Sequence, residues 1–312
     1  MLKLIQNEWM KMWQKQGTWV MLIFLVIFII VPGGMTKYQD TKNAEDTTWQ
    51  EVVQQQMNFY KDILASEDLS ETDIQNYEEE IAIREYRLAN NVPIQLETSI
   101  ADFMAFSSNW VMLVTLFTVV LAASIVSSEF STGTIKMLLT RPISRAKVLT
   151  SKLITVFLFG VLLLIVNIGV SAITGFVLFD ATTSAPLEMV DGNIVEKDVW
   201  GDLGYSYLLA CGDFVMSTLF AFFVGSVFRS SSLAIGLTMF LSFMGQMIVS
   251  LLSKYEIVKY IWITHTNLKQ YETGNILVEG ITMPFSLTVL AIYAVLFIVI
   301  SYLSFMKRDV TA

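Results

Sequence analysis

Six long apolar stretches constrain this chain more than any other feature. They cover residues 17–35, 103–126, 153–179, 207–228, 233–252 and 285–306. The hydrocarbon core of a bilayer is about 30 Å thick, and a helix needs roughly 20 apolar residues to cross it. Only 15% of the residues are charged, too few for the surface of a soluble domain of 312 residues. We therefore predict an all-α integral membrane protein with six transmembrane helices.

The lysines and arginines beside these stretches collect on one side of the membrane. That side holds eleven basic and three acidic residues, whereas the other side holds nine basic and 24 acidic residues. Short cytoplasmic loops are enriched in lysine and arginine, so we predict that the N and C termini lie on the cytoplasmic side of the cell membrane. No basic face indicates a nucleic-acid partner. The eleven basic residues are Lys3, Lys11, Lys15, Lys136, Arg141, Arg145, Lys147, Lys152, Arg229, Lys307 and Arg308.

Residues 1–16 have the spacing of an amphipathic helix lying in the inner membrane interface. One side carries Leu2, Ile5, Trp9, Met12, Trp13 and Gln16, and the other carries Lys3, Asn7, Lys11, Gln14 and Lys15. A cleavable signal peptide is the competing interpretation, but a signal peptide has no use for such a face. A plain flanking segment with aromatic anchors is the other alternative.

The segment between the first two spans, residues 36–102, predicts an extracytoplasmic helical hairpin. It contains 5 basic and 15 acidic residues. Thr48 with Glu51, and Ser70 with Asp73, have the spacing of capping boxes, and each pair opens a run of helix-favouring residues. The aromatic residues of the two runs are expected to pack the helices together.

Two further outer segments follow. Residues 180–206 form a short acidic loop. Residues 253–284 are amphiphilic but too short to span, which favours short re-entrant helices in the outer leaflet or a simple interfacial loop. His265 in this segment is expected to be an interfacial polar residue.

The residues that usually support catalysis are scarce. One histidine and one cysteine in the whole chain exclude a metal site with the usual His or Cys ligands. There is no Gly-rich phosphate loop ending in Gly-Lys-Ser or Gly-Lys-Thr. We therefore expect a non-catalytic chain that binds no cofactor of its own.

Polar residues within the apolar stretches are candidates for function, because a charge in hydrocarbon is costly unless it faces protein or water. Asp213 is the only ionisable residue well inside a stretch. Either it belongs to a transport pathway, or the fourth span begins later and Asp213 caps it in the outer interface. Asn167 and Gln246 are expected to form hydrogen bonds across helices.

The cytoplasmic segment from 127 to 152 has the most specific pattern. Residues 134–140 predict a short amphipathic helix with Ile135, Leu138 and Leu139 on one side. Pro142 ends this helix because it forces Arg141 out of helical geometry. Ser144 is then placed to cap the helix that enters the third span.

This segment resembles the cytoplasmic signature of ABC-2 type transporter permeases. The residues that carry the resemblance are Glu129, Gly133, Thr134, Leu138, Leu139, Pro142, Ile143, Ser144, Arg145 and Lys152. Six spans, cytoplasmic termini, an amphipathic N-terminal helix and an amphiphilic stretch before the last span also resemble that family. The helical hairpin at about 44–90 departs from many of its members.

The resemblance implies a permease subunit of an ATP-driven exporter. Its partners would be a second permease, identical or related, and two copies of a soluble subunit that binds ATP and magnesium. The helix at 133–140 would dock on that ATPase. Glu129 would order the loop through backbone amides or pair with a basic residue of the assembly. Arg141, Arg145 and Lys147 would meet either acidic ATPase residues or lipid phosphates.

Two other classes of protein are weaker alternatives. A secondary, ion-coupled transporter using Asp213 would show internal repeats or broken helices with paired charges, and the sequence has no repeat. A membrane-embedded hydrolase would need a catalytic set that this chain lacks.

Overall fold

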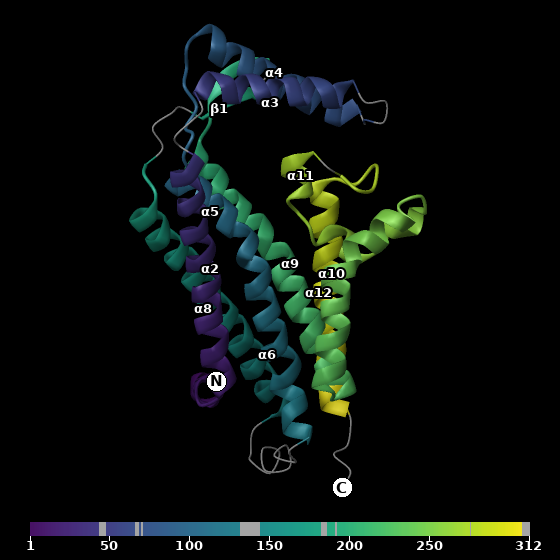
Figure 1. The fold of residues 1–312 in the computed structure, drawn as a ribbon. Helices are drawn as coiled ribbons and strands as arrows, with labels where there is room; N and C mark the ends of the chain where they lie inside the picture. Colours follow the sequence, from purple (N-terminus) through teal and green to yellow (C-terminus); the bar gives the residue numbers. More distant parts are fainter. Residues whose placement is uncertain are drawn as a thin grey trace. The chain divides into compact units, whose positions relative to one another are not determined.

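The computed structural model describes residues 1–43, 48–65, 69, 71–131, 144–181, 186–190, 192–274 and 276–307. These residues are mostly helical, and six helices among them are long and apolar enough to cross a membrane (Figure 1). The candidate spans are Gln16–Lys42, Ile100–Ser131, Arg145–Leu178, Val199–Phe228, Ser231–Leu252 and Met283–Lys307. The prediction of a helical membrane protein with six apolar helices is confirmed. Helices suit these stretches because a helix satisfies every backbone polar group within the segment.

Most of these helices extend past the ends expected from apolarity alone. Their bounds are α2 Gln16–Asn43, α6 Val111–Ser131, α8 Arg145–Leu178, α9 Val199–Phe228, α10 Ser231–Leu252 and α12 Met283–Lys307. Before α6, the second span contains α5 (Ile100–Ser107) and a 3₁₀ turn, η1 (Ser108–Trp110). The 3₁₀ turn interrupts the α-helical geometry of this span. Apolarity measures contact with lipid, whereas a helix continues into polar residues until a cap or a turn ends it.

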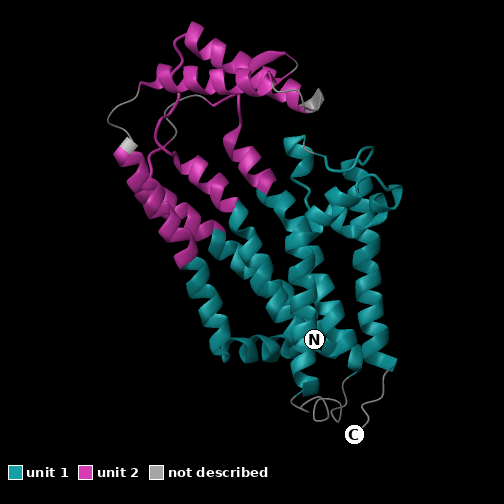
Figure 2. Ribbon diagram, turned by 45° about the vertical axis from the view of Figure 1, so that its right-hand side comes forward, with its two compact units in different colours: residues 1–26, 109–167, 207–312 teal, residues 27–108, 168–206 magenta. Residues whose placement is uncertain are grey.

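The chain divides into two compact units (Figure 2). The first unit contains residues 1–26, 109–167 and 207–312, and the second contains residues 27–108 and 168–206. Helices α2, α8 and α9 each contribute to both units.

The second unit contains a pair of helices, α3 (Trp49–Leu64) and α4 (Glu71–Ala89), which lie side by side (Figure 1). The predicted capping box at Thr48 and Glu51 is present, with both of its hydrogen bonds. The Arg84 guanidinium lies 4.6 Å from the centre of the Tyr60 ring and joins the two helices. Ser70, the other predicted cap, lies outside the described residues.

A two-stranded antiparallel hairpin also belongs to the second unit. Strand β1 (Leu187–Val190) pairs with β2 (Asn193–Glu196), and Leu187 is opposite Glu196. Gly192 in the turn has a φ of 76°, a left-handed conformation that glycine adopts without a steric penalty. The sequence predicted only a loop here, because strands of four residues are too short to show a clear alternation.

Close backbone approach joins the helices of the first unit. A Cβ on Gly225 of α9 would lie 2.6 Å from the backbone oxygen of Ala123 on α6, so only glycine fits there. The hydroxyls of Ser127 on α6 and Ser231 on α10 are 2.6 Å apart. Between α9 and α10, Arg229 adopts a left-handed φ of 56°, which ends α9 and lets the chain reverse.

Short helical turns cover one end of α10 in the first unit. They are η2 (Glu256–Tyr260), η3 (Trp262–His265) and α11 (Gln270–Thr273). The prediction for His265 was wrong, because this side chain is fully buried. Its Nδ1 lies 2.5 Å from the Ser286 hydroxyl, and its Nε2 lies 2.9 Å from the Lys259 carbonyl oxygen. Two internal hydrogen bonds replace the water that an interfacial histidine would use.

Candidate functional site

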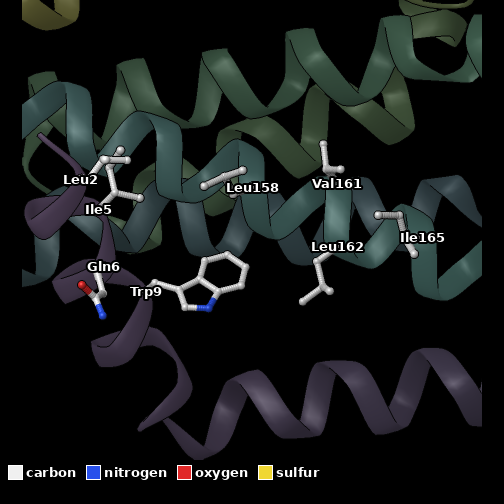
Figure 3. A pocket seen from close by; sticks show the side chains of 8 residues that line it. All are labelled: Leu2, Ile5, Gln6, Trp9, Leu158, Val161, Leu162 and Ile165. Atoms are coloured by element: carbon white, nitrogen blue, oxygen red, sulfur yellow. The ribbon is translucent and has the colours of Figure 1, made fainter.

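Helix α1 (Leu2–Trp13) lies at an angle to the first turns of α2 (Figure 2) and presents different faces to its neighbours. With 3.6 residues per turn, Leu2, Ile5 and Trp9 fall on one side of the helix, and Glu8, Lys11 and Met12 fall on another. The first side lines a groove of about 550 Å³ together with Leu158, Val161, Leu162 and Ile165 (Figure 3). Figure 3 shows these four residues following one another along α8. The apolar face of α1 therefore lies against α8.

The second side of α1 meets a buried lysine. Lys152 belongs to α8, and its side chain is 1% exposed. Its Nζ donates to Glu8 Oε2 at 2.7 Å, to Glu129 Oε1 at 2.7 Å and to the Ile125 carbonyl oxygen at 3.1 Å. An ammonium group has three donors, so all three are used. Lys152 thus joins α1, α6 and α8 through a single atom.

Lys11 completes this group of charges from the more exposed side. Its Nζ lies 3.0 Å from Glu8 Oε1 and 3.4 Å from Glu129 Oε1. Each carboxylate therefore contacts both lysines, and the four charges balance. We call Glu8, Lys11, Glu129 and Lys152 the charge network. The side chains of Glu8 and Glu129 are only 8% and 11% exposed.

The network favours the charged forms of Glu8 and Lys11. Burial by itself would raise the pKa of the Glu8 carboxyl, but the charge and hydrogen bond of Lys152, with a smaller effect of Lys11, lower this pKa below the usual glutamate value. Burial would likewise lower the pKa of the Lys11 amine, but Glu8 and Glu129 raise it above the usual lysine value. A buried ion pair stabilises a fold only when its hydrogen bonds compensate for lost hydration, and the geometry around Lys152 meets this condition.

A cavity of about 320 Å³ borders the network. Its walls combine the four charged residues with Met12, Lys15, Leu121, Ile125 and Ser128. Lys11 is 46% exposed, so water reaches one side of the network while Lys152 stays dry.

The structure brings together two residues of the predicted cytoplasmic signature, Glu129 and Lys152. They are 23 residues apart and flank the loop. Glu129 pairs with two basic residues of its own chain, Lys152 and Lys11. The other loop residues named as coupling candidates, Gly133, Ile135, Leu138, Leu139, Arg141 and Pro142, lie outside the described residues.

Arg145 starts α8, as expected, and one of its contacts is internal. It donates through Nη1 to the carbonyl oxygen of Met306, at 3.2 Å, near the end of α12. Phe130 of α6 and Phe305 of α12 pack edge to face with ring centres 6.2 Å apart. The ends of α6, α8 and α12 are therefore connected at the same level. Ser144, the predicted cap, accepts the backbone N–H of Val148 through its carbonyl oxygen.

Sequence reasoning missed Glu8 and Lys11 as members of this site. Glu8 was counted only as an acidic residue beside many basic ones, and Lys11 only as part of a polar face. One signal was available. Glu8 and Glu129 are lone carboxylates in otherwise basic or neutral segments on the same predicted side, and a lone carboxylate near buried helices requires a cationic partner.

The three intramembrane candidates have different surroundings. Asp213 lies near the middle of the 30-residue helix α9, so it does not cap the start of that helix. Gln246 of α10 donates through Nε2 to the Ile263 carbonyl oxygen at 3.1 Å. Ile263 belongs to the short turn η3, so this hydrogen bond does not join two spans. Asn167 is fully buried, and neither of its amide atoms has a hydrogen-bond partner among the described residues. The hydrogen bond across helices that was predicted for Asn167 is therefore not present among the described residues.

These features define a class: an integral membrane protein with several apolar helices, whose N-terminal helix is attached to two of them by a buried charge network. The chain belongs to the family described as "Protein of unknown function (DUF2705)", whose model matches residues 74–311.

Two relatives come from Bacillus subtilis (strain 168). The chain is 36% identical to the "Uncharacterized protein YhcI" over 315 residues, which cover 99% of each chain. It is 31% identical to the "Uncharacterized membrane protein YdbK" over 211 residues, which cover 67% of this chain and 82% of that protein. The second description agrees with the membrane location indicated by the apolar helices.

Proposed function

We propose that this chain is the membrane-spanning permease subunit of an ABC-2 type ATP-driven exporter. The observation that carries the proposal is the pairing of Glu129 with Lys152. Both residues belong to the pattern that resembles the ABC-2 cytoplasmic signature. Their ion pair fixes the ends of α6 and α8 on either side of residues 132–143, where the docking helix is expected.

A loop can pass movement to the membrane only when its attachment points are stiff. Lys152 holds the end of α6 through Glu129 and Ile125, and it holds α1 through Glu8. A push on the loop would then move α1, α6 and α8 together rather than bend the loop against loose helix ends. This geometry is suited to a chain that receives mechanical work from a soluble partner.

The rest of the assembly follows from the same proposal. The N and C termini face the cytoplasm of a bacterial cell, and the α3–α4 pair lies on the outer side. Two soluble subunits bind and hydrolyse ATP with magnesium, while this chain is non-catalytic and pairs with a second permease in the bilayer. The direction of transport is export.

Copurification with a soluble ATPase tests the proposal. We would express the chain with a candidate soluble ATP-binding subunit and replace both Leu138 and Leu139 by Asp, which removes most of the apolar side of the expected docking helix. The double variant is expected to lose the ATPase while remaining in the membrane. Leu96→Asp, at a leucine that is 49% exposed outside the spans, is the matched control and is expected to retain the ATPase. Undiminished copurification of the double variant contradicts the proposal.

A secondary transporter using Asp213 is the second candidate, because this carboxylate lies inside an apolar helix. Proteoliposomes separate the two. Transport that requires ATP and the soluble subunit supports the permease, and transport driven by an ion gradient alone supports the alternative.

A further inference from the structure

The register of α9 against α10 places several oxygen atoms together. The two helices are joined by only two residues, and Ser217 and Ser242 lie eleven residues from Phe228 and Ser231, the ends that meet at this connection. Their hydroxyl oxygens are 3.4 Å apart. This contact brings one point of α9 beside one point of α10.

One turn further from the connection, the same sides carry Asp213 and Gln246. Ser217 donates to Asp213 Oδ1 at 3.1 Å, so these two residues share a face of α9. Gln246 follows Ser242 by four residues and therefore shares its face of α10. Asp213 and Gln246 therefore each lie about one helical turn beyond the Ser217–Ser242 contact.

Thr266 lies near both Gln246 of α10 and the residue before Asp213 on α9. The Thr266 hydroxyl accepts from Gln246 Nε2 at 3.3 Å. The backbone carbonyl oxygen of Thr266 would lie 3.4 Å from a Cβ placed on Gly212, the residue before Asp213. The same residue therefore touches α10 at Gln246 and α9 beside Asp213.

Two features of this site lack a partner among the described residues. Gln246 Oε1 is buried and accepts no hydrogen bond there. The orientation of the amide is not arbitrary, because the Ile263 carbonyl oxygen can only accept and so must face the NH₂ group. Asp213 forms no ion pair with any described residue, although an ionised carboxylate within a span needs a cation or water. The Asp213 residue is not fully buried.

Deepening the proposed function, on which this step rests, we propose that Asp213 and Gln246, with the hydroxyls of Ser217 and Ser242, bind an amine of the transported substrate. An ammonium group carries one positive charge and three donors, matching one carboxylate and neighbouring acceptors. The surrounding helix pair is apolar. The substrate class is therefore an amphiphile with a protonated amine.

Binding of a fluorescent amine to the purified chain tests the site without the ATPase. The probe is dansylcadaverine, titrated into protein in phosphatidylcholine nanodiscs, and its N-acetyl derivative supplies the same apolar body without the charge. The amine is expected to bind at least about tenfold more tightly than the acetylated probe, the difference expected for a charged hydrogen bond. Asp213→Asn should abolish this difference, whereas Asp213→Glu should retain it. Asp202→Asn removes an exposed carboxylate from the same helix and should change nothing.

A second variant keeps the test decisive if Asp213→Asn does not fold. Ser242→Ala removes one of the proposed acceptors without adding charge and should weaken amine binding several-fold. Equal binding of both probes, or no change in Asp213→Asn and Ser242→Ala, overturns the proposal. Displacement of the amine by sodium but not by potassium at equal ionic strength also overturns it, because Asp213 would then be an ion site.

The two proposals fail in different ways. Amine binding that persists when no ATPase copurifies leaves this site intact and removes the permease assignment. ATP-dependent transport without amine preference removes only the substrate class.

Discussion

Replacing Lys152 by Met tests whether the charge network attaches α1 to the spans. Methionine keeps the apolar stem of lysine and removes only the charge. Glu8 and Glu129 would then face one another with Lys11, which is 46% exposed, as their one remaining cation in the network. The variant therefore leaves two buried carboxylates poorly compensated.

The structure sets the expected magnitude. The Lys152 side chain is 1% exposed and forms bonds of 2.7, 2.7 and 3.1 Å. Removing one partner of a buried ion pair typically costs about 3–5 kcal/mol. We expect Lys152→Met to lower the free energy of unfolding by this amount. Lys147→Met, at an exposed lysine of the same helix, is expected to cost less than about 0.5 kcal/mol.

Two measurements separate global unfolding from release of α1. Unfolding in mixed micelles gives the free energy change. A cysteine placed at Met12, a buried position of α1, gives the release rate through its reaction with a maleimide, after Cys211, the single cysteine, is replaced by Ser. Labelling should be faster in Lys152→Met and unchanged in Lys147→Met.

Rescue decides the electrostatic part of the reasoning. Glu8→Gln and Glu129→Gln, added to Lys152→Met, remove the stranded charges and should recover much of the lost stability, because neutral substitutes for a buried ion network are often tolerated. The reasoning is refuted if Lys152→Met costs less than about 1 kcal/mol, the size of an exposed pair, or if the combined variant is less stable than Lys152→Met alone.

Three further predictions concern the first unit. The pKa of Glu8 is lowered in the folded state, so its contribution to stability is complete above the usual glutamate pKa of about 4.3. This contribution is lost as the pH falls through the lower pKa of the folded state. Glu8→Gln should therefore flatten the dependence of the thermal unfolding midpoint on pH between about 5 and 3. His265→Ala should destabilise the fold by about 2–4 kcal/mol, because it opens a cavity and strands the Lys259 carbonyl; chemical denaturation measures this, and a cost below 1 kcal/mol contradicts the buried placement. Gly225→Val should cost about 1–3 kcal/mol or more by forcing α6 and α9 apart, whereas Gly17→Val, where a Cβ meets nothing within 4 Å, should not; equal melting temperatures would refute the close approach.

The fold was largely predictable, and the candidate site only in part. Helical spacing in residues 1–16 predicted α1, which ends earlier, at Trp13, and the capping box at Thr48 predicted the start of α3. The strands β1 and β2 and the burial of His265 were not predicted, because four-residue strands show little periodicity and a single histidine has no pattern. The family pattern identified Glu129 and Lys152, but it did not predict that they contact one another.

The sequence by itself determined the number of the apolar helices and where along the chain each lies. Each is a local property, since every backbone hydrogen bond of a membrane helix closes within the segment and about 20 apolar residues suffice to cross the bilayer. The tertiary structure alone decided that Lys152 meets Glu8, 144 residues away, and that Ser217 meets Ser242. Such pairings depend on how helices pack and on their register, and a run of apolar residues has the same composition in every register.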